Sequence, residues 1–293
     1  MMEVNGSAGI ETRLDPCPLC GGVRGRLRLR LPFDRVWGQG SIDRAGEVLS
    51  LYECWECGLQ RFSPLELGGG QLYAELESDS GYYKATRWEF DVVAPEITPD
   101  DRVLDLGCGD GAFLRRVRGV AQQVAGYDFN PDAVQELARA GIDGFHGSLD
   151  DVTDRVTEQF SVVTAFHVVE HLPDARGFVS AGLRALRPGG TFVISVPNRD
   201  RLRLADVEPL DFPPHHASRW SEAQLARLGD ETGLTLVNVE YEPTRWRTQL
   251  HVLAYRAASV VRRTPATPGA PLLRDQVRNR RRGLAVLARY RRL

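Results

Sequence analysis

Residues 103–111 read Val103-Leu104-Asp105-Leu106-Gly107-Cys108-Gly109-Asp110-Gly111. They overlap an apolar stretch, Arg102–Leu106, that predicts a buried strand, and they precede Ala112–Val117, which predicts a helix. Glycines at such a turn let the backbone approach a ligand closely. Asp128 follows about 20 residues later, where a carboxylate can accept hydrogen bonds from ribose hydroxyls. The turn therefore predicts a nucleotide-type cofactor site in an α/β domain; the alternative is a turn that merely needs glycine.

The spacing of these glycines separates two cofactor classes. A dinucleotide site is typical of G-x-G-x-x-G, with a pyrophosphate at the helix N-terminus. Here the spacing is G-x-G-x-G, and Asp105 lies just before the first glycine. A carboxylate at that position suits a cationic ligand better than a pyrophosphate. The run Asp105–Gly111 closely resembles the first motif of class I S-adenosylmethionine-dependent methyltransferases.

The resemblance extends over residues 81–243. Gly147–Leu149 resembles the family's adenine-contacting turn, Phe166–Leu172 its fourth motif, and Leu186–Gly190 the turn before its fifth strand. In related enzymes a tyrosine-bearing segment folds over the cofactor, which would involve Tyr83; ordinary aromatic packing is the alternative. The cofactor contacts implied by the resemblance are Asp105, Gly107, Cys108, Gly109, Gly111, Asp128, Phe129, Ser148, Leu149, His167 and Tyr83, with Cys108 packed beside the cofactor.

Strands and helices alternate through the middle of the chain, which predicts a Rossmann-like, doubly wound parallel sheet with ligands at the carboxyl ends of its strands. A capping box of Ser221 and Gln224 predicts a helix that Gly233 ends. For the family's last antiparallel strand, Leu250–Tyr255 is the only candidate. The other predicted elements are strands at Gln123–Tyr127, Ser161–Phe166, Thr191–Val196 and Thr235–Tyr241, a helix at Pro131–Ala140, a helix ending at Arg187, and a turn at Pro188–Gly190.

Histidines and one glutamate follow the predicted fourth and fifth strands. Glu170 and His171 follow the fourth strand, and His215 and His216 follow the fifth. A histidine near its ordinary pKa can accept a proton at neutral pH, so these four residues are the candidate catalytic groups; helix capping or core packing is the alternative for each. His167-x-x-Glu170-His171 is also similar to the Glu-x-x-Glu-His motif that is linked to a divalent cation in quinone-pathway O-methyltransferases, although its first residue differs.

Four of the five cysteines form two C-x-x-C pairs near the N-terminus. Cys17 and Cys20 make the first pair, and Cys54 and Cys57 the second, and each pair is followed by glycine. Four thiolates at this spacing predict a structural zinc site. Arg26–Leu31 and Leu51–Glu53 have strand character, so a zinc-ribbon-like module is expected, and disulfides are the alternative.

The composition is that of an ordinary globular protein, and the first residues show neither a basic start nor an apolar stretch. No run approaches the roughly 20 apolar residues that span a bilayer. We therefore expect a cytoplasmic protein. Four segments are expected: a zinc-binding module (1–66), a connector that covers cofactor and substrate (67–100), a methyltransferase domain (101–243) and a basic C-terminal tail (244–293).

The tail carries an uneven share of the charge. Thirteen arginines and one acid in residues 245–293 give +12, which leaves −14 for residues 1–244 because the whole chain carries −2. Apolar residues between Gln276 and Leu293 recur at near-helical spacing, which predicts a basic amphipathic helix outside the catalytic core. Three roles remain open for it: contact with an anionic or membrane surface, docking on the acidic body of the chain, or a lid over a phosphorylated substrate.

Three function classes are compatible with these patterns. The leading one is methylation of oxygen or carbon in a small polar or glycosylated metabolite, because zinc modules also precede the similar sugar C-methyltransferases. The second is an RNA methyltransferase that binds phosphates through the zinc module and the arginine-rich tail; the acidic body of the chain and the lack of an Asn-Pro-Pro-Tyr-like motif make nucleic acid the weaker choice. The third is a non-catalytic binding protein, which the intact glycine turn disfavours. The sequence does not predict an oligomeric state.

Overall fold

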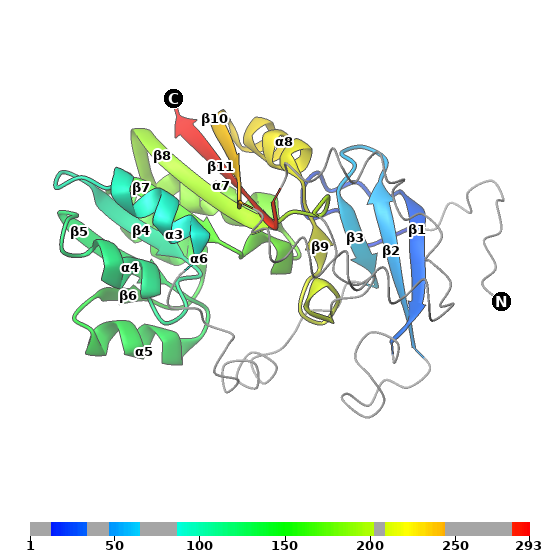
Figure 1. The fold of residues 1–293 in the computed structure, drawn as a ribbon, viewed down its shortest axis with the longest axis horizontal. Helices are drawn as coiled ribbons and strands as arrows, with labels where there is room; N and C mark the ends of the chain where they lie inside the picture. Colours follow the sequence, from blue (N-terminus) through cyan, green and yellow to red (C-terminus); the bar gives the residue numbers. More distant parts are fainter. Residues whose placement is uncertain (1–12, 34–46, 65–86, 202–208, 244–282) are drawn as a thin grey trace.

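The protein folds around two β-sheets that lie side by side (Figure 1). The computed structural model describes residues 13–33, 47–64, 87–201, 209–243 and 283–293. Predicted features in the remaining segments, including Tyr83 and Leu250–Tyr255, lie outside the described residues.

The larger sheet has seven strands in the order β10-β11-β8-β7-β4-β5-β6. Neighbouring strands from β8 to β6 are parallel, while β11 is antiparallel to both of its neighbours. This confirms the predicted doubly wound sheet of class I methyltransferases. The strands are β4 (Arg102–Leu106), β5 (Gln123–Tyr127), β6 (Asp143–Phe145), β7 (Phe160–Phe166), β8 (Leu186–Pro197), β10 (Leu234–Tyr241) and β11 (Ala285–Arg292).

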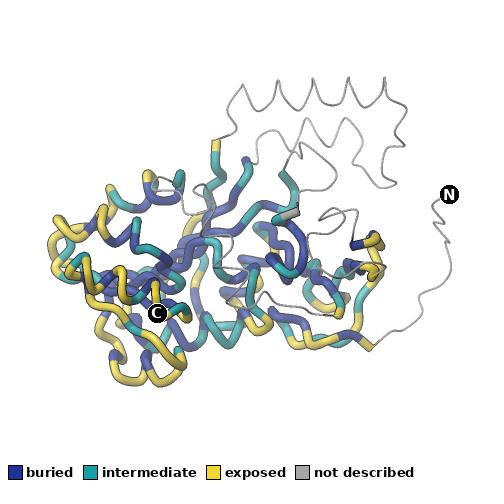
Figure 2. Tube along the Cα trace, turned by 90° about the horizontal axis from the view of Figure 1, so that it is seen from below, coloured by how far each residue is buried: buried dark blue, intermediate teal, exposed yellow. Residues whose placement is uncertain are grey.

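Helices cover both faces of this sheet and close two apolar clusters. The central strands β4 and β7 are almost wholly buried, and Figure 2 shows buried segments in the interior of the molecule and exposed ones around its outside. On one face lie α3 (Trp88–Val93), α4 (Ala112–Val117) and α5 (Pro131–Arg139). On the other lie α6 (Leu149–Arg155), α7 (Ala175–Ala185) and α8 (Glu222–Thr232). The short 3-10 helices are η1 (Ala94–Glu96), η2 (Val169–His171) and η3 (Pro209–Asp211).

Two local predictions need correction. The predicted turn at Pro188–Gly190 is a bulge inside β8, where Leu186 pairs with Phe160 and Thr191 pairs with Val162. At the start of α8 the Ser221 hydroxyl does not cap the helix but donates to Gln224 Oε1 at 2.6 Å. Gln224 Nε2 in turn donates to the carbonyl of Cys57 at 3.0 Å. The predicted capping pair therefore ties α8 to the cysteine module instead.

The predicted basic helix over Gln276–Leu293 is wrong for its C-terminal half. Residues Ala285–Arg292 form β11, which lies between β8 and β10 in the larger sheet. All of its residues from Ala285 to Tyr290 are buried. Arg289 is buried because its guanidinium pairs with Glu96 and Glu240. This end of the chain is therefore part of the catalytic fold, and no separate role remains for it as an exposed helix.

A single hydroxyl on β11 gives a test of this placement. Tyr290 is fully buried, and its hydroxyl donates to the carbonyl of Leu225 in α8 at 2.9 Å. We expect Tyr290→Phe to lower the free energy of unfolding by about 1–2 kcal/mol, because the buried hydrogen bond between the hydroxyl and that carbonyl is lost. Urea denaturation measures the change, with Tyr52→Phe on the half-buried surface of β2 as the control. Unchanged stability of Tyr290→Phe would contradict the burial of β11.

The smaller sheet is antiparallel, in the order β1-β2-β3-β9. Its first three strands are β1 (Gly25–Pro32), β2 (Val48–Cys54) and β3 (Gln60–Ser63). The first two coincide with the two predicted strand segments, whereas β3 was not predicted. The fourth, β9 (Ser218–Arg219), comes from the chain that follows β8. The N-terminal module therefore shares a sheet with a loop of the larger domain. Among the helices that the structure describes, none has the length and apolar character of a membrane span.

Candidate active site

The glycine turn after β4 has the geometry of a ligand cradle. Gly107, Gly109 and Gly111 have φ of +73°, +51° and +76°, a region that residues with a Cβ atom rarely adopt. A Cβ on Gly107 would lie 2.5 Å from Val168 Cγ2, and one on Gly111 would lie 2.2 Å from Leu137 Cδ2. Glycine is therefore required at positions 107 and 111 both by the positive φ and by the lack of room for a Cβ atom.

Asp128, at the end of β5, holds the turn in place. Its Oδ2 accepts from the Gly109 N–H and its Oδ1 accepts from the Asn130 N–H, both at 2.9 Å. The side chain is 6% exposed. The Asn130 side chain caps α5 by accepting from the Asp132 N–H. The predicted acidic residue thus lies directly beside the glycine turn, where a ribose would reach it.

Asp105 lies beneath the same turn. It is 4% exposed, and its Oδ1 accepts a hydrogen bond of 2.7 Å from the Thr164 hydroxyl. Burial raises the pKa of this carboxyl to about 7, although the Thr164 bond opposes the rise. A cation bound nearby would favour the ionised form.

The other predicted cofactor contacts fall into two groups. Phe129 is an exposed aromatic residue beside Asp128, and Ser148 is the N-cap of α6, which begins at Leu149. Tyr127, at the end of β5, donates through its hydroxyl to the carbonyl of Gly147. This hydrogen bond holds the start of α6 near the glycine turn. Cys108, in contrast, belongs to the apolar cluster on the α4 and α5 face. Its Sγ would be 2.7 Å from a Cβ on Gly126, so the thiol packs into the core under the turn.

His167 forms an ion-pair network after β7. Its φ of +56° is unusual for a residue with a side chain. Nε2 lies 2.5 Å from Glu89 Oε1, and Nδ1 lies 3.3 Å from Glu170 Oε1. Burial opposes protonation, but the two carboxylates raise the pKa of His167 to about 9. This imidazolium is thus suited to charge neutralisation and unsuited to metal ligation.

Glu170 is the most completely buried acid of this network, at 1% exposure. Burial opposes its charge, yet His167, whose Nδ1 lies 3.3 Å away, and the nearby His171 keep the pKa of Glu170 below the usual range. Neither carboxylate oxygen accepts a hydrogen bond from the described residues. A buried carboxylate in this state is typical of functional sites rather than of ordinary cores.

Three histidines meet at the same edge of the sheet, and we call them the histidine cluster: His171, His215 and His216. Their ring centroids lie 4.5–4.8 Å apart. His171 ends η2 after β7, while the other two lie between η3 and β9. The structure therefore brings together side chains that are 44 residues apart in the sequence. A small pocket borders the cluster, lined by Pro197, Arg199, Arg201, Asp211, His216, Ser218 and Arg219.

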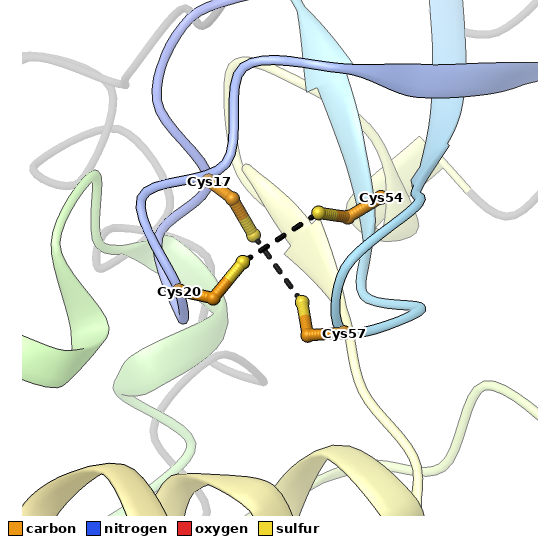
Figure 3. A group of neighbouring side chains, drawn as sticks. All are labelled: Cys17, Cys20, Cys54 and Cys57. Atoms are coloured by element: carbon orange, nitrogen blue, oxygen red, sulfur yellow. Dashed lines mark hydrogen bonds between the residues drawn. The ribbon is translucent and has the colours of Figure 1, made fainter.

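The four N-terminal cysteines converge on one point (Figure 3). The Sγ atoms of Cys17 and Cys57, and those of Cys20 and Cys54, are 3.6 Å apart. Zinc–sulfur bonds of about 2.3 Å in a tetrahedron place sulfurs about 3.8 Å apart, whereas a disulfide requires about 2 Å. The arrangement therefore fits a four-thiolate metal site, and these four cysteines form no disulfides with one another in this structure.

Two matching turns present these thiols. In each C-x-x-C pair, the glycine after the second cysteine has a positive φ, and its N–H donates to the carbonyl of the first cysteine. Arg61 Nη2 donates to the carbonyl of Gly22 in the first turn at 3.0 Å. Arg61 is 1% exposed, and its Nε and Nη1 atoms have no partner among the described residues. A buried cation beside this turn would complement the two negative charges that four thiolates and one Zn²⁺ would carry together.

Three residues that contact the histidines or the cysteine turns were not predicted from the sequence. Glu89 and Arg61 carry no local motif, because their partners are His167 and Gly22, which are distant in the chain. Asp211 has a weak signal, since it precedes the adjacent pair His215 and His216 by a few residues. Its carboxylate lies 3.7 Å from His216 Nδ1 and is held by Arg201 at 2.6 Å through both oxygens.

Comparison with known proteins covers more than half of the chain. A family model described as a methyltransferase domain matches residues 79–239. A probable S-adenosylmethionine-dependent methyltransferase from Mycolicibacterium smegmatis is 31% identical over 173 residues, which are 58% of this chain and 66% of that protein. A ubiquinone biosynthesis O-methyltransferase from Xanthomonas oryzae is 28% identical over 183 residues, 53% of this chain and 74% of that protein.

A solved structure agrees with the fold. The crystal structure of an S-adenosylmethionine-dependent methyltransferase from Archaeoglobus fulgidus has a TM-score of 0.51 and 19% sequence identity. It covers 69% of this chain and 91% of its own. At that identity the likeness shows the shared fold alone.

Proposed function

This chain belongs to the methyltransferase domain family and is an S-adenosylmethionine-dependent methyltransferase, and we propose that it methylates an oxygen or carbon atom of a small polar or glycosylated metabolite. The observation that carries the proposal is the shared edge of the sheet, where the glycine turn after β4 and the histidine cluster after β7 and β8 both lie. The similarity to an O-methyltransferase supports oxygen as the acceptor atom.

The residues of the turn fit the methyl donor. Asp128 would accept from ribose hydroxyls, Phe129 would cover the adenine, and the N-terminus of α6 at Ser148 would face its polar edge. Asp105 would balance the positive charge of the cofactor. Gly109, which has a φ of +51°, would let the backbone approach the cofactor closely. The bound cofactor supplies a methyl group on a sulfonium, already activated for in-line displacement.

The histidine cluster and Glu170 would act on the acceptor. Methyl transfer to oxygen needs an acceptor held in line with the donor and a place for the hydroxyl proton. His171, His215 and His216 supply neutral imidazoles at this edge, because burial lowers the pKa of each. Glu170 would hold the resulting positive charge nearby. These roles follow the position of the residues after β7 and β8.

We further propose that the four-cysteine cluster holds one zinc ion in a structural role. The sulfur spacing and the buried Arg61 support it. The ion would fix the two C-x-x-C turns, and through them the sheet that ends in β9. All four of its positions would be filled by protein, so it would not take part in chemistry.

The proposed function is tested first by cofactor binding and then by methyl transfer. Calorimetry should show binding of S-adenosylmethionine and its demethylated product, each at micromolar concentration, and no binding of NAD. Methyl-labelled cofactor should then transfer label to a member of a panel of hydroxylated metabolites and nucleotide sugars. Transfer to RNA but to no small molecule would overturn the proposed acceptor class. Absence of cofactor binding would overturn the proposed site itself.

Asp105 gives this binding a pH dependence of known sign. Its carboxyl is largely protonated below pH 7 in the free protein, since burial raises its pKa to about 7. Binding of a cation favours the carboxylate, so binding releases a proton and affinity should rise with pH, by up to about tenfold per unit below the pKa. Calorimetry in two buffers of different ionisation enthalpy measures the proton release. Asp105→Asn should bind weakly and without this pH dependence; an equal pH dependence in the variant would contradict the assignment.

A further inference from the structure

The histidine cluster has the spacing of a metal site. One ring nitrogen each from His171, His215 and His216 lies within 4.8 Å of the other two. Two of the residues are buried and the third is partly buried. They come from two separate segments of the chain, so their convergence is a property of the fold and not of a sequence repeat.

The backbone fixes which nitrogen each ring presents. His171 Nδ1 bonds to the carbonyl of His215 at 2.6 Å, and His215 Nδ1 bonds to the carbonyl of Leu210 at 2.8 Å. A carbonyl only accepts, so each Nδ1 carries the proton and each Nε2 carries the lone pair that can bind a metal. Imidazole ligands of metals commonly donate their other N–H to a carbonyl in this way.

The third histidine has the other common outer partner. His216 Nδ1 faces the carboxylate of Asp211 at 3.7 Å, and Arg201 holds that carboxylate through both oxygens. Histidine backed by a carboxylate is a frequent arrangement at zinc.

We propose that His171, His215 and His216 bind a second divalent transition-metal ion of the zinc class, separate from the four-cysteine site. Three imidazoles suit zinc and exclude calcium and magnesium, which prefer oxygen ligands. Three protein ligands leave a fourth position open, as at catalytic zinc sites. The ligand set differs from the His167-x-x-Glu170-His171 motif, because His167 is engaged by Glu89 and Glu170.

The role of this ion, though not its binding, rests on the proposed function. An acceptor hydroxyl at the open position would have a lowered pKa, as water bound to zinc does. With the three rings bound to the ion, the hydroxyl proton would pass to solvent and not to a histidine, so this route would replace the proton acceptance by imidazole proposed above. An oxygen lone pair would then form the new bond to the methyl carbon as the carbon–sulfur bond breaks, leaving a neutral thioether.

Metal content tests the proposal without any acceptor. Full-length protein without a histidine tag, equilibrated with micromolar Zn²⁺ and desalted, should contain two zinc ions per chain. His215→Ala and His216→Ala should each contain one, with affinity at the lost site at least about 100-fold weaker. The matched control is His146→Ala, which alters an exposed histidine outside the cluster and should keep two. One zinc ion in the wild type, or two in both cluster variants, would overturn the proposal.

Cobalt spectroscopy provides a second test in case the histidine variants fail to fold. Cobalt bound by thiolates gives intense sulfur charge-transfer bands, whereas cobalt bound by three nitrogens does not. The wild type should show both a thiolate site and a nitrogen site, and Asp211→Asn should weaken only the nitrogen site, by about 10–100-fold. A wild type with the thiolate site alone would overturn the proposal. Two ions with no methyl transfer would uphold it and overturn the proposed function.

Discussion

Replacement of Asp128 by Asn is expected to lower the affinity for S-adenosylmethionine by about 100-fold or more. Both carboxylate oxygens accept from backbone N–H groups, of Gly109 and Asn130. An amide has one oxygen, so its NH₂ group would face one of these donors. Each hydrogen bond to a charged group contributes about 1.5–3 kcal/mol, and 1.4 kcal/mol is a factor of ten. Loss of the charge would also weaken the hydrogen bonds that we propose between Asp128 and the ribose hydroxyls.

Calorimetric titration with the cofactor measures this effect. Asp143→Asn is the matched control, because Asp143 is an exposed acid at the start of the neighbouring strand β6. It should bind the cofactor as the wild type does. If Asp128→Asn bound with wild-type affinity and an unchanged thermal midpoint, the glycine turn after β4 would not be the cofactor site.

The parts of the fold that the sequence predicted well are those with a local cause. β4, α4 and β5 have the predicted bounds, since each combines an apolar run or helical pattern with a glycine or proline boundary. The four-cysteine cluster also follows from local spacing. The family resemblance is confirmed by the matching family model and by the relatives.

β11 was missed because its burial has a distant cause. Arginines in this segment have the pattern of a solvent-exposed helix face when viewed alone. In the fold, Arg289 pairs with Glu96 and Glu240, which are 193 and 49 residues away. Arg292 likewise donates to backbone carbonyls near the end of α7 and pairs with Glu158. Distant acids therefore turn a charged segment into an interior strand, and no periodicity within the segment reveals them.

For the histidine cluster, the sequence predicted where the side chains lie but not how their rings are oriented. The rule that ligands bind at the carboxyl ends of parallel strands predicts that His171, His215 and His216 lie at one edge of the sheet. It could not supply the carbonyl and carboxylate partners that orient the rings, because these depend on the turn between η3 and β9. Orientation, not proximity, is what distinguishes a metal site from packed histidines.

Loss of the zinc ion that we propose at the four-cysteine cluster is expected to have the largest effect on stability. Cys54→Ser removes one of four thiolates, and structural zinc contributes an apparent 10–16 kcal/mol, roughly, in small zinc-binding domains. That exceeds what the short strands β1 to β3 can supply alone. We expect the variant to lose the cysteine-bound ion and to unfold the smaller sheet. The control is Cys108→Ala, since Cys108 lies in the core under the glycine turn and should leave the zinc content unchanged.

The same variant tests whether the module positions the histidine cluster. The Phe62 N–H donates to the carbonyl of Ala217, and the Ala217 N–H donates to the carbonyl of Glu170. β3 thus fixes the residue that directly follows His216. Hydrogen exchange in Cys54→Ser should become fast at residues 60–63 and 217–219. Residues 103–106 should stay protected and cofactor affinity should be kept, because β4 lies inside the larger sheet. Protection retained at residues 217–219 would show that the loop is held independently of zinc, whereas parallel loss of cofactor binding would show that both sheets unfold as one unit.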